Sequence, residues 1–259
     1  MTIRALAAPG AESLPERFAR WFAGRGWAPH AHQLALLDHA HAGRSALLIA
    51  PTGGGKTLAG FLPSLIDLAE SRAEGLHTLY VSPLKALAVD VHRNLELPIA
   101  EMKLGIRAET RTGDTPQAKR QRQRERPPHM LLTTPESLAL LLSFPDAGAM
   151  FAGLRAIVVD EIHALAPNKR GDLLSLGLAR LATLAPQARR IGLSATVADR
   201  AGLARWLGSG LAQMPELVIG RGGVKAEIAI LVPEARHALG RADLNDEVNV
   251  APVDAEVER

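Results

Sequence analysis

Ala50–Thr57 (APTGGGKT) is the stretch that decides the fold of this 259-residue chain. The apolar run Ser45–Ala50 before it predicts a strand, and the residues from Lys56 to Leu68 have the apolar spacing of a helix. A strand, a glycine-rich loop and a helix in this order are the sequence context of a phosphate-binding loop. The first position of the strict loop pattern is Ala50 instead of glycine, so one residue departs from it.

The loop has the residue types that hold phosphate groups. Three consecutive glycines let backbone N–H groups approach a phosphate closely, and the start of the helix adds unpaired donors. Lys56 can neutralise the β- and γ-phosphates, and the Thr57 hydroxyl can ligate Mg²⁺. The alternative is a flexible loop with a solvated lysine, which the strand–loop–helix order disfavours. The residues predicted to bind the nucleotide are Thr52, Gly53, Gly54, Gly55, Lys56 and Thr57.

Two adjacent acids stand at the end of another apolar run, Ala156–Asp160 (AIVVD). A carboxylate at the tip of a buried strand can hold Mg²⁺, while its neighbour polarises the water that attacks the γ-phosphate. Asp160 is therefore the predicted metal-side residue, and Glu161 is the predicted general base. Alone, the pair could equally be a solvated acidic turn, but the phosphate loop in the same chain favours the catalytic interpretation.

Further short runs rich in Val, Ile and Leu alternate with segments of helical spacing. This alternation predicts an α/β fold, with a parallel sheet that is covered by helices on both faces. Ligands bind outside the carboxyl ends of the strands in such sheets, and the loop and the acid pair both lie there. The other predicted strands are Thr78–Val81, Met130–Thr133, Arg190–Ser194 and Ala226–Leu231, and the other predicted helices include Leu84–Leu97 and Arg200–Leu207.

The composition restricts the class of protein only weakly. The chain has 47% hydrophobic and 22% charged residues, and no apolar run approaches the roughly 20 residues that cross a bilayer. It has no cysteine, which excludes disulfides and thiolate metal sites and fits a reducing cytoplasm. The net charge of +3 suits contact with a phosphate backbone, although many proteins without such a partner are as basic.

Two segments depart from the strand–helix alternation. Ala118–Arg126 (AKRQRQRER) predicts an exposed basic helix before two prolines, and such a run is more often a solvated face than a nucleic-acid contact. The tail from Pro233 is acidic and poor in large apolar side chains, which predicts an extended or disordered segment.

Several further motifs follow one another in a recognisable order. They are Ser82–Ala88 (SPLKALA), Thr112–Thr115 (TGDT), Thr133–Ser137 (TTPES), Asp160–His163 (DEIH) and Ser194–Thr196 (SAT), with Trp27 and Gln33 upstream. Together with the phosphate loop, they resemble a superfamily-two helicase of the DEXH-box type. The wording of SPLKALAVD, RTGDT, DEIHAL and KRGDLLSLGLARL is similar to the large helicase-related (Lhr) group, nearest the bacterial ligase-associated DEXH-box helicases of the DNA damage response.

The resemblance implies a P-loop NTPase with a RecA-like sheet, ATP and Mg²⁺ as cofactors, and a single strand of DNA as partner. The residues themselves do not distinguish DNA from RNA. Gln33 would read the adenine edge, and Ser194 and Thr196 would link the γ-phosphate to domain closure through His163. The residues that would contact the strand are Pro83, Lys85, Ala86, Gly113, Thr134 and Glu136. The implied division is a helical segment 1–30, an ATP-binding domain 31–232 and a tail 233–259.

Each of these residues also has a structural interpretation. Gln33 could be an ordinary helix-surface residue, and His163 could be a structural histidine. Thr134 before proline is equally a turn that ends a strand, since proline restricts its predecessor to extended geometry. Ser194–Thr196 is uninformative by itself. Trp27 could stack on adenine or pack the N-terminal helix.

The resemblance also places the arginine finger on a second RecA-like domain, for which we find no motif after Thr196. An arginine finger contributes about 10³–10⁵ in rate. We therefore expect this chain alone to bind ATP and a strand, to hydrolyse ATP slowly and not to unwind a duplex. The alternative is a non-catalytic ATP- and strand-binding module, or half of a split motor whose second domain is on another chain.

Overall fold

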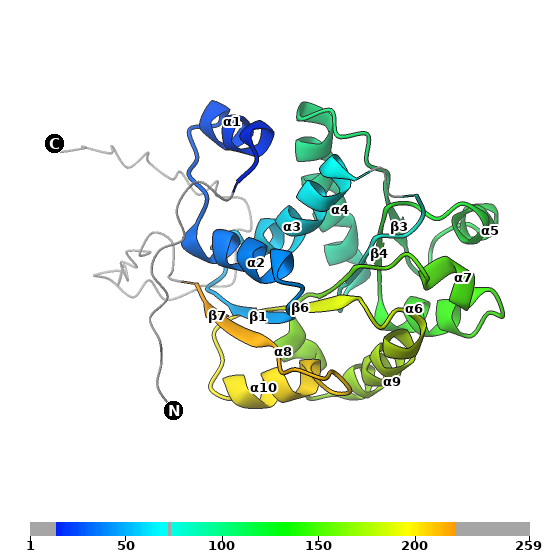
Figure 1. The fold of residues 1–259 in the computed structure, drawn as a ribbon. Coiled ribbons are helices and arrows are strands. Elements are labelled where there is room, and N and C mark those ends of the chain that lie inside the picture. Colours follow the sequence, from blue (N-terminus) through cyan, green and yellow to red (C-terminus); the bar gives the residue numbers. More distant parts are fainter. Residues whose placement is uncertain (1–13, 72–73, 221–259) are drawn as a thin grey trace, which may run out of the picture. The chain divides into compact units, whose positions relative to one another are not determined.

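The computed structural model describes residues 14–71 and 74–220, which form a parallel sheet covered by helices (Figure 1). The strand order is β3-β4-β2-β5-β6-β1-β7, and each hydrogen-bonded pair is parallel. The strands are β1 (Ala46–Ile49), β2 (Thr78–Val81), β3 (Ala108–Arg111), β4 (Met130–Thr133), β5 (Ala156–Val159), β6 (Arg189–Ser194) and β7 (Glu216–Ile219). The predicted α/β fold with a parallel sheet is confirmed.

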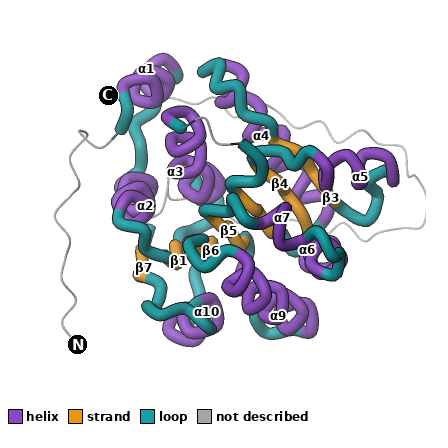
Figure 2. Tube along the Cα trace, turned by 45° about the vertical axis from the view of Figure 1, so that its right-hand side comes forward, coloured by secondary structure: helices purple, strands orange, loops and turns teal. Residues whose placement is uncertain are grey.

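Helices lie on both faces of the sheet (Figure 2). They are α1 (Glu16–Gly24), α2 (Ala31–His41), α3 (Lys56–Glu70), α4 (Lys85–Glu101), α5 (Gln117–Glu125), α6 (Pro135–Leu142), α7 (Ala147–Phe151), α8 (Ile162–Leu165), α9 (Lys169–Leu184) and α10 (Arg200–Leu207). Side chains of α1 to α4 share one hydrophobic cluster, and side chains of α6 to α10 share the other.

Strand β1 shows why these short apolar runs form a buried parallel sheet. Its side chains alternate between the two clusters: Ala46 and Leu48 pack into the first, and Leu47 and Ile49 pack into the second. All four are at most 2% exposed. Because helices cover both faces, a continuous apolar run is buried in full, which is the pattern that the sequence carries.

Since the strands are parallel, their carboxyl ends meet at one edge of the sheet. The phosphate loop follows β1, the acid pair follows β5 and the SAT motif follows β6, three strands that are neighbours in the order β5-β6-β1. The loops after β2, β3 and β4 carry the three motifs that were predicted to contact a strand. The topology therefore gathers motifs that are far apart in the sequence.

The predicted elements within the described residues are found with small shifts at their ends. The structure also has two strands that were not predicted from the sequence. The missed strands are β3, which reads AETR, and β7, which reads ELVI. Both lie at the edges of the sheet, where burial is incomplete: β3 is mostly polar, whereas β7 has an apolar run but three of its four residues are exposed. The predicted strand 226–231 and the tail 233–259 lie outside the described residues.

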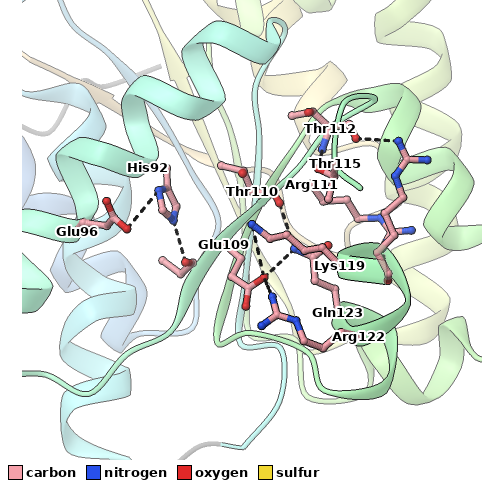
Figure 3. Close-up of polar contacts among 12 residues, drawn as sticks. His92, Glu96, Glu109, Thr110, Arg111, Thr112, Thr115, Lys119, Arg122 and Gln123 are labelled. Atoms are coloured by element: carbon pink, nitrogen blue, oxygen red, sulfur yellow. Dashed lines mark hydrogen bonds and ion pairs between the residues drawn. The ribbon is translucent and has the colours of Figure 1, made fainter. Parts of the chain in front are cut away.

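Helix α5 is the basic helix that the sequence predicted, but its polar side chains also pack against the edge strand β3 (Figure 3). Gln123 is completely buried, and its amide donates to the Thr110 carbonyl at 3.1 Å and to the Glu109 carboxylate at 2.9 Å. Arg122 pairs with the same carboxylate at 2.6 Å. The helix therefore covers a free sheet edge, and its cations are partly used in the fold.

No helix among the described residues is both long and apolar enough to cross a membrane.

Candidate nucleotide and nucleic-acid site

The phosphate loop has the backbone conformation that its glycines predict. Gly53 and Gly55 have φ values of 79° and 70°, in the left-handed region that favours glycine, and Gly55 is the residue before helix α3. A Cβ atom on Gly55 would lie 2.9 Å from the side-chain nitrogen of Gln33. The backbone conformation therefore favours glycine at this position, and any larger residue would also displace the Gln33 amide.

The side chains around the loop are bonded to the loop itself. The Lys56 ammonium donates to the Pro51 carbonyl at 3.0 Å and is 8% exposed. The Gln33 amide donates to the Gly55 carbonyl at 3.3 Å, and its oxygen accepts from the His30 N–H at 2.9 Å. Gln33 is 2% exposed, so it is not a helix-surface residue but a link between helix α2 and the loop.

The two acids have different surroundings. Asp160 is 6% exposed at the end of β5, and its carboxylate accepts from the Tyr80 hydroxyl at 2.5 Å and from the Glu161 N–H at 2.9 Å. Burial raises the pKa of Asp160, an effect that the Tyr80 hydrogen bond and the charge of Lys56 oppose. Glu161 has a φ of 45° and stands before helix α8, with its side chain partly exposed.

His163 lies between the acid pair and the SAT motif. Its Nε2 is 3.3 Å from the Glu161 carboxylate, and its Nδ1 is 3.3 Å from the Ser194 hydroxyl and 3.4 Å from the Ala195 N–H. The structure therefore brings Ser194 to His163, whereas Thr196 is exposed and makes no hydrogen bond to either of them. The contribution of Ala195 could not be predicted, because a backbone N–H has no residue-type signal.

A groove of about 580 Å³ contains all six residues that were predicted to contact a strand. It is lined by Pro83, Leu84, Lys85, Ala86, Gly113, Thr134, Glu136, Ser137, Leu140 and Arg170. Sequence reasoning did not assign Leu84 and Leu140, which are 56% and 58% exposed, or Ser137 and Arg170. Ser137 lies in the TTPES motif and Arg170 in the KRGDLLSLGLARL segment, but nothing in their spacing distinguished them from helix-surface residues.

Charge and backbone geometry shape the groove. The Lys85 ammonium pairs with Asp114 at 2.8 Å, and a Cβ on Gly113 would approach that ammonium to 3.2 Å. The Thr134 hydroxyl accepts from the Ser137 N–H at 3.4 Å and thereby caps helix α6. Thr134 therefore has the structural role that its proline neighbour indicated, and it also faces the groove.

A second pocket, of about 320 Å³, lies between the start of helix α3 and helices α1 and α4. It is lined by Gly55 and Thr57 of the phosphate loop and by the rings of Trp21, Trp27 and Phe61. Trp27 packs edge-on against Trp21 at 5.9 Å and is 52% exposed. The Trp27 ring therefore packs against helix α1, while part of the ring stays exposed and can stack on another aromatic ring.

Comparison with known proteins agrees with this arrangement. A family model for the DEAD/DEAH box helicases matches residues 30–202. The chain belongs to this family. It is 44% identical over 191 residues to ATP-dependent helicase Lhr-Core of Methanothermobacter thermautotrophicus, with 68% of this chain and 22% of the relative covered. It is 39% identical over 236 residues to the Lhr helicase/uracil glycosylase of Escherichia coli, with 83% and 15% covered.

Solved structures place the chain in the same group. The helicase Lhr of Mycobacterium smegmatis, solved with ssDNA and AMP-PNP, is 42% identical with a TM-score of 0.72, over 80% of this chain and 27% of that one. The DUF1998 helicase MrfA is 30% identical with a TM-score of 0.72, over 82% and 33%. The resemblance to Lhr-like helicases and the RecA-like fold are confirmed, and the chain spans about a quarter or less of its Lhr relatives.

Proposed function

We propose that this chain is the ATP-binding motor domain of an Lhr-like, ATP-dependent DNA helicase. The observation that carries the proposal is the shared carboxyl edge of the sheet, where the phosphate loop, the acid pair and the six-residue groove follow neighbouring strands. AMP-PNP and ssDNA are bound in the Lhr structure that this chain resembles, which supports the same two classes of ligand here.

ATP binding would exchange bonds within the loop for bonds to phosphate. Lys56 would leave the Pro51 carbonyl and donate to the β- and γ-phosphates, where its charge is matched. The N–H groups at the start of helix α3 would add donors. The pocket beside Gly55 and Thr57 suits a nucleobase, since Trp27 offers an exposed aromatic ring, with Gln33 nearby to read the adenine edge.

The donor set fits Mg²⁺. Mg²⁺ prefers oxygen ligands and usually takes one or two protein carboxylates beside phosphates and water, and Asp160 with the Thr57 hydroxyl supplies that set. Asp160 and Thr57 would hold the ion, which would supply positive charge beside the phosphates. Glu161 would then orient and deprotonate the attacking water.

We expect His163 to couple the nucleotide to the SAT motif, because it contacts both the acid pair and that motif. A movement of the Glu161 carboxylate would change its contact with Nε2 of the ring. The ring would then move relative to Ser194 and Ala195, which contact Nδ1. Thr196 would join this coupling only if the exposed end of the motif moved.

The groove would hold the phosphate backbone of a single strand. Lys85 and the backbone near Gly113 would contact phosphates, and Thr134 and Glu136 would contact the next phosphate or sugar. Such contacts hold a strand without reading its sequence, as a translocating motor requires. DNA is favoured over RNA because the Lhr and MrfA structures were solved with ssDNA and DNA.

The finer assignments stay predictions. They include the domain limits 31–232, a place in DNA repair beside the ligase-associated helicases, and the bacterial cytoplasm as location. Unwinding is proposed for the whole protein, because this chain spans 22% of the Lhr-Core relative.

The proposal is tested by nucleotide binding and strand-dependent turnover of the purified chain. Fluorescent MANT-ATP with Mg²⁺ should bind and be displaced by ATP, and Lys56→Ala should weaken this binding about 100-fold. Oligodeoxythymidine should bind in the groove and raise ATP turnover only slightly, because the resemblance places the arginine finger on a second domain.

The outcomes separate the alternatives. ATP and strand binding without turnover would favour the non-catalytic module or the split motor, and fast stimulated turnover would refute the expectation of a slow lone domain. Unchanged MANT-ATP binding by Lys56→Ala would refute the phosphate-loop assignment. Stronger binding of oligouridine than of oligodeoxythymidine would overturn the choice of DNA.

A further inference from the structure

We propose that Arg170 is a further phosphate-contacting residue of the strand groove and that Glu136 is the positioning residue that holds it. The inference rests on the proposed function, because it requires a single strand in the groove. It also changes the role of Glu136, from a direct contact to an indirect one.

The two side chains form a fork-to-fork pair on the groove wall. The Arg170 Nε donates to one Glu136 oxygen at 2.5 Å, and an Nη donates to the other at 2.9 Å. This uses two of the five N–H donors of a guanidinium, so three stay free along its outer edge. The arginine side chain is 37% exposed and lines the groove together with Lys85 and Thr134. A phosphate in the groove can therefore be bound by the free edge.

Glu136 is poorly suited to meet a phosphate itself. The hydrogen bonds from Arg170 lower the pKa of Glu136 to about 2, so the side chain is an anion at neutral pH. An anion repels phosphate, and both of its oxygens already accept from Arg170. The chemistry therefore assigns the phosphate contact to the cation of the pair.

The backbone under Arg170 is held firmly. The Asn168 side chain accepts from the Arg170 N–H at 2.9 Å and from the Gly171 N–H at 3.3 Å, and so caps helix α9. A Cβ on Gly171 would overlap the Leu165 carbonyl at the end of helix α8. The start of α9 therefore packs directly on α8, the helix that carries His163. One short segment, residues 160–170, thus joins the acid pair to the groove.

The test removes the pair without changing net charge. Oligodeoxythymidine binding is measured by fluorescence anisotropy over a salt series, for the full chain and for the double variant Arg170→Ala/Glu136→Gln. One lost phosphate contact should reduce the slope of log K against log salt by about 0.7, which at 0.1 M salt is about fivefold weaker binding. A pair that only supports the fold should leave both affinity and slope unchanged, and that result would overturn the proposal.

Two further variants guard against misfolding and against a failure of the groove itself. Arg180→Ala removes an exposed cation from the same helix outside the groove and should bind like the wild type, and both variants should keep a cooperative melting transition. Lys85→Ala tests the groove independently. Weaker binding by Lys85→Ala beside unchanged binding by the double variant would refute Arg170 alone, whereas unchanged binding by both would refute the groove.

The role of Glu136 is tested by comparing the single variant Arg170→Ala with the double variant Arg170→Ala/Glu136→Gln. Once Arg170→Ala is present, adding Glu136→Gln should restore only the affinity lost to the unpaired anion and leave the salt slope as it is. A further loss of affinity on adding Glu136→Gln would mean that Glu136 contacts the strand directly, and this would overturn its positioning role.

Discussion

The phosphate loop and the strand groove lie on the same edge of the sheet, but their polar groups have different partners. In the loop, Lys56 and Gln33 are bonded to the carbonyls of Pro51 and Gly55, so the groups meant for the nucleotide are bonded to the loop. In the groove, all six predicted contacts already line one open surface. Lys56 must therefore exchange a buried bond within its own loop for phosphate, whereas Lys85 in the groove exchanges only an exposed pair with Asp114.

The difference has an energetic meaning. Breaking the bonds within the loop costs part of the free energy that the phosphates supply, whereas the exposed Lys85–Asp114 pair of the groove contributes at most about 1 kcal/mol. Substitutions in the loop should therefore change both nucleotide affinity and stability. Substitutions in the groove should change strand affinity and leave the fold almost untouched.

The largest effect is expected at Lys56. Replacing it with alanine should weaken MANT-ATP binding about 100-fold, since a charge-assisted bond to phosphate contributes about 1.5–3 kcal/mol. Isothermal titration or fluorescence titration measures this directly. Arg205→Ala, which removes an exposed cation on helix α10, should leave nucleotide binding unchanged.

The loop glycines should separate backbone strain from crowding. Gly53 and Gly55 both have positive φ, but a Cβ meets nothing within 4 Å at Gly53 and meets Gln33 at 2.9 Å at Gly55. We expect Gly53→Ala to cost about 1 kcal/mol of unfolding free energy and Gly55→Ala about 2 kcal/mol, because the second also displaces the Gln33 amide. Equal losses in urea denaturation would show that the Gln33 contact contributes nothing.

Strand affinity in the groove should depend on the Lys85 ammonium. Lys85→Ala should weaken oligodeoxythymidine binding about fivefold at 0.1 M salt, through one lost phosphate contact. Asp114→Asn should instead tighten binding about twofold, because it frees the Lys85 ammonium from a surface pair that contributes at most about 1 kcal/mol. A parallel change in MANT-ATP affinity for either variant would contradict the separation of the two sites.

The smallest effect is a pH dependence of stability at the groove wall. The folded pKa of Glu136, about 2, lies below its ordinary value of 4.5. Its stabilising contribution is thus complete above pH 4.5 and is lost as the pH falls towards 2. Because the pair is substantially exposed, we expect less than about 1 kcal/mol. Urea denaturation of wild type and Arg170→Ala at pH 6 and pH 3.5 should show the two curves converging at the lower pH.

Much of the fold and of the nucleotide site could be predicted because their signals are local. The strand, loop and helix around residues 45–68 are contiguous in the sequence. The apolar run AIVV likewise places the acids that follow it, Asp160 and Glu161, at the tip of a strand through local sequence alone. The edge strand β3 could not be predicted, since AETR lacks the apolar run that full burial imposes, whereas β7 carries the apolar run of ELVI and was overlooked in the sequence. Tyr80 likewise had no signal, because its partner Asp160 is 80 positions away.

The sequence by itself determined the order of the motifs, the alternation of strands and helices, and the chemistry of the phosphate loop. Only the tertiary structure decided that three separate loops would line one groove, that Glu136 would be bound by an arginine 34 positions later, and that Lys56 would be bonded to its own loop. The physical reason is range. Backbone periodicity and residue type act over a few positions, whereas the packing of parallel strands brings distant loops to one edge.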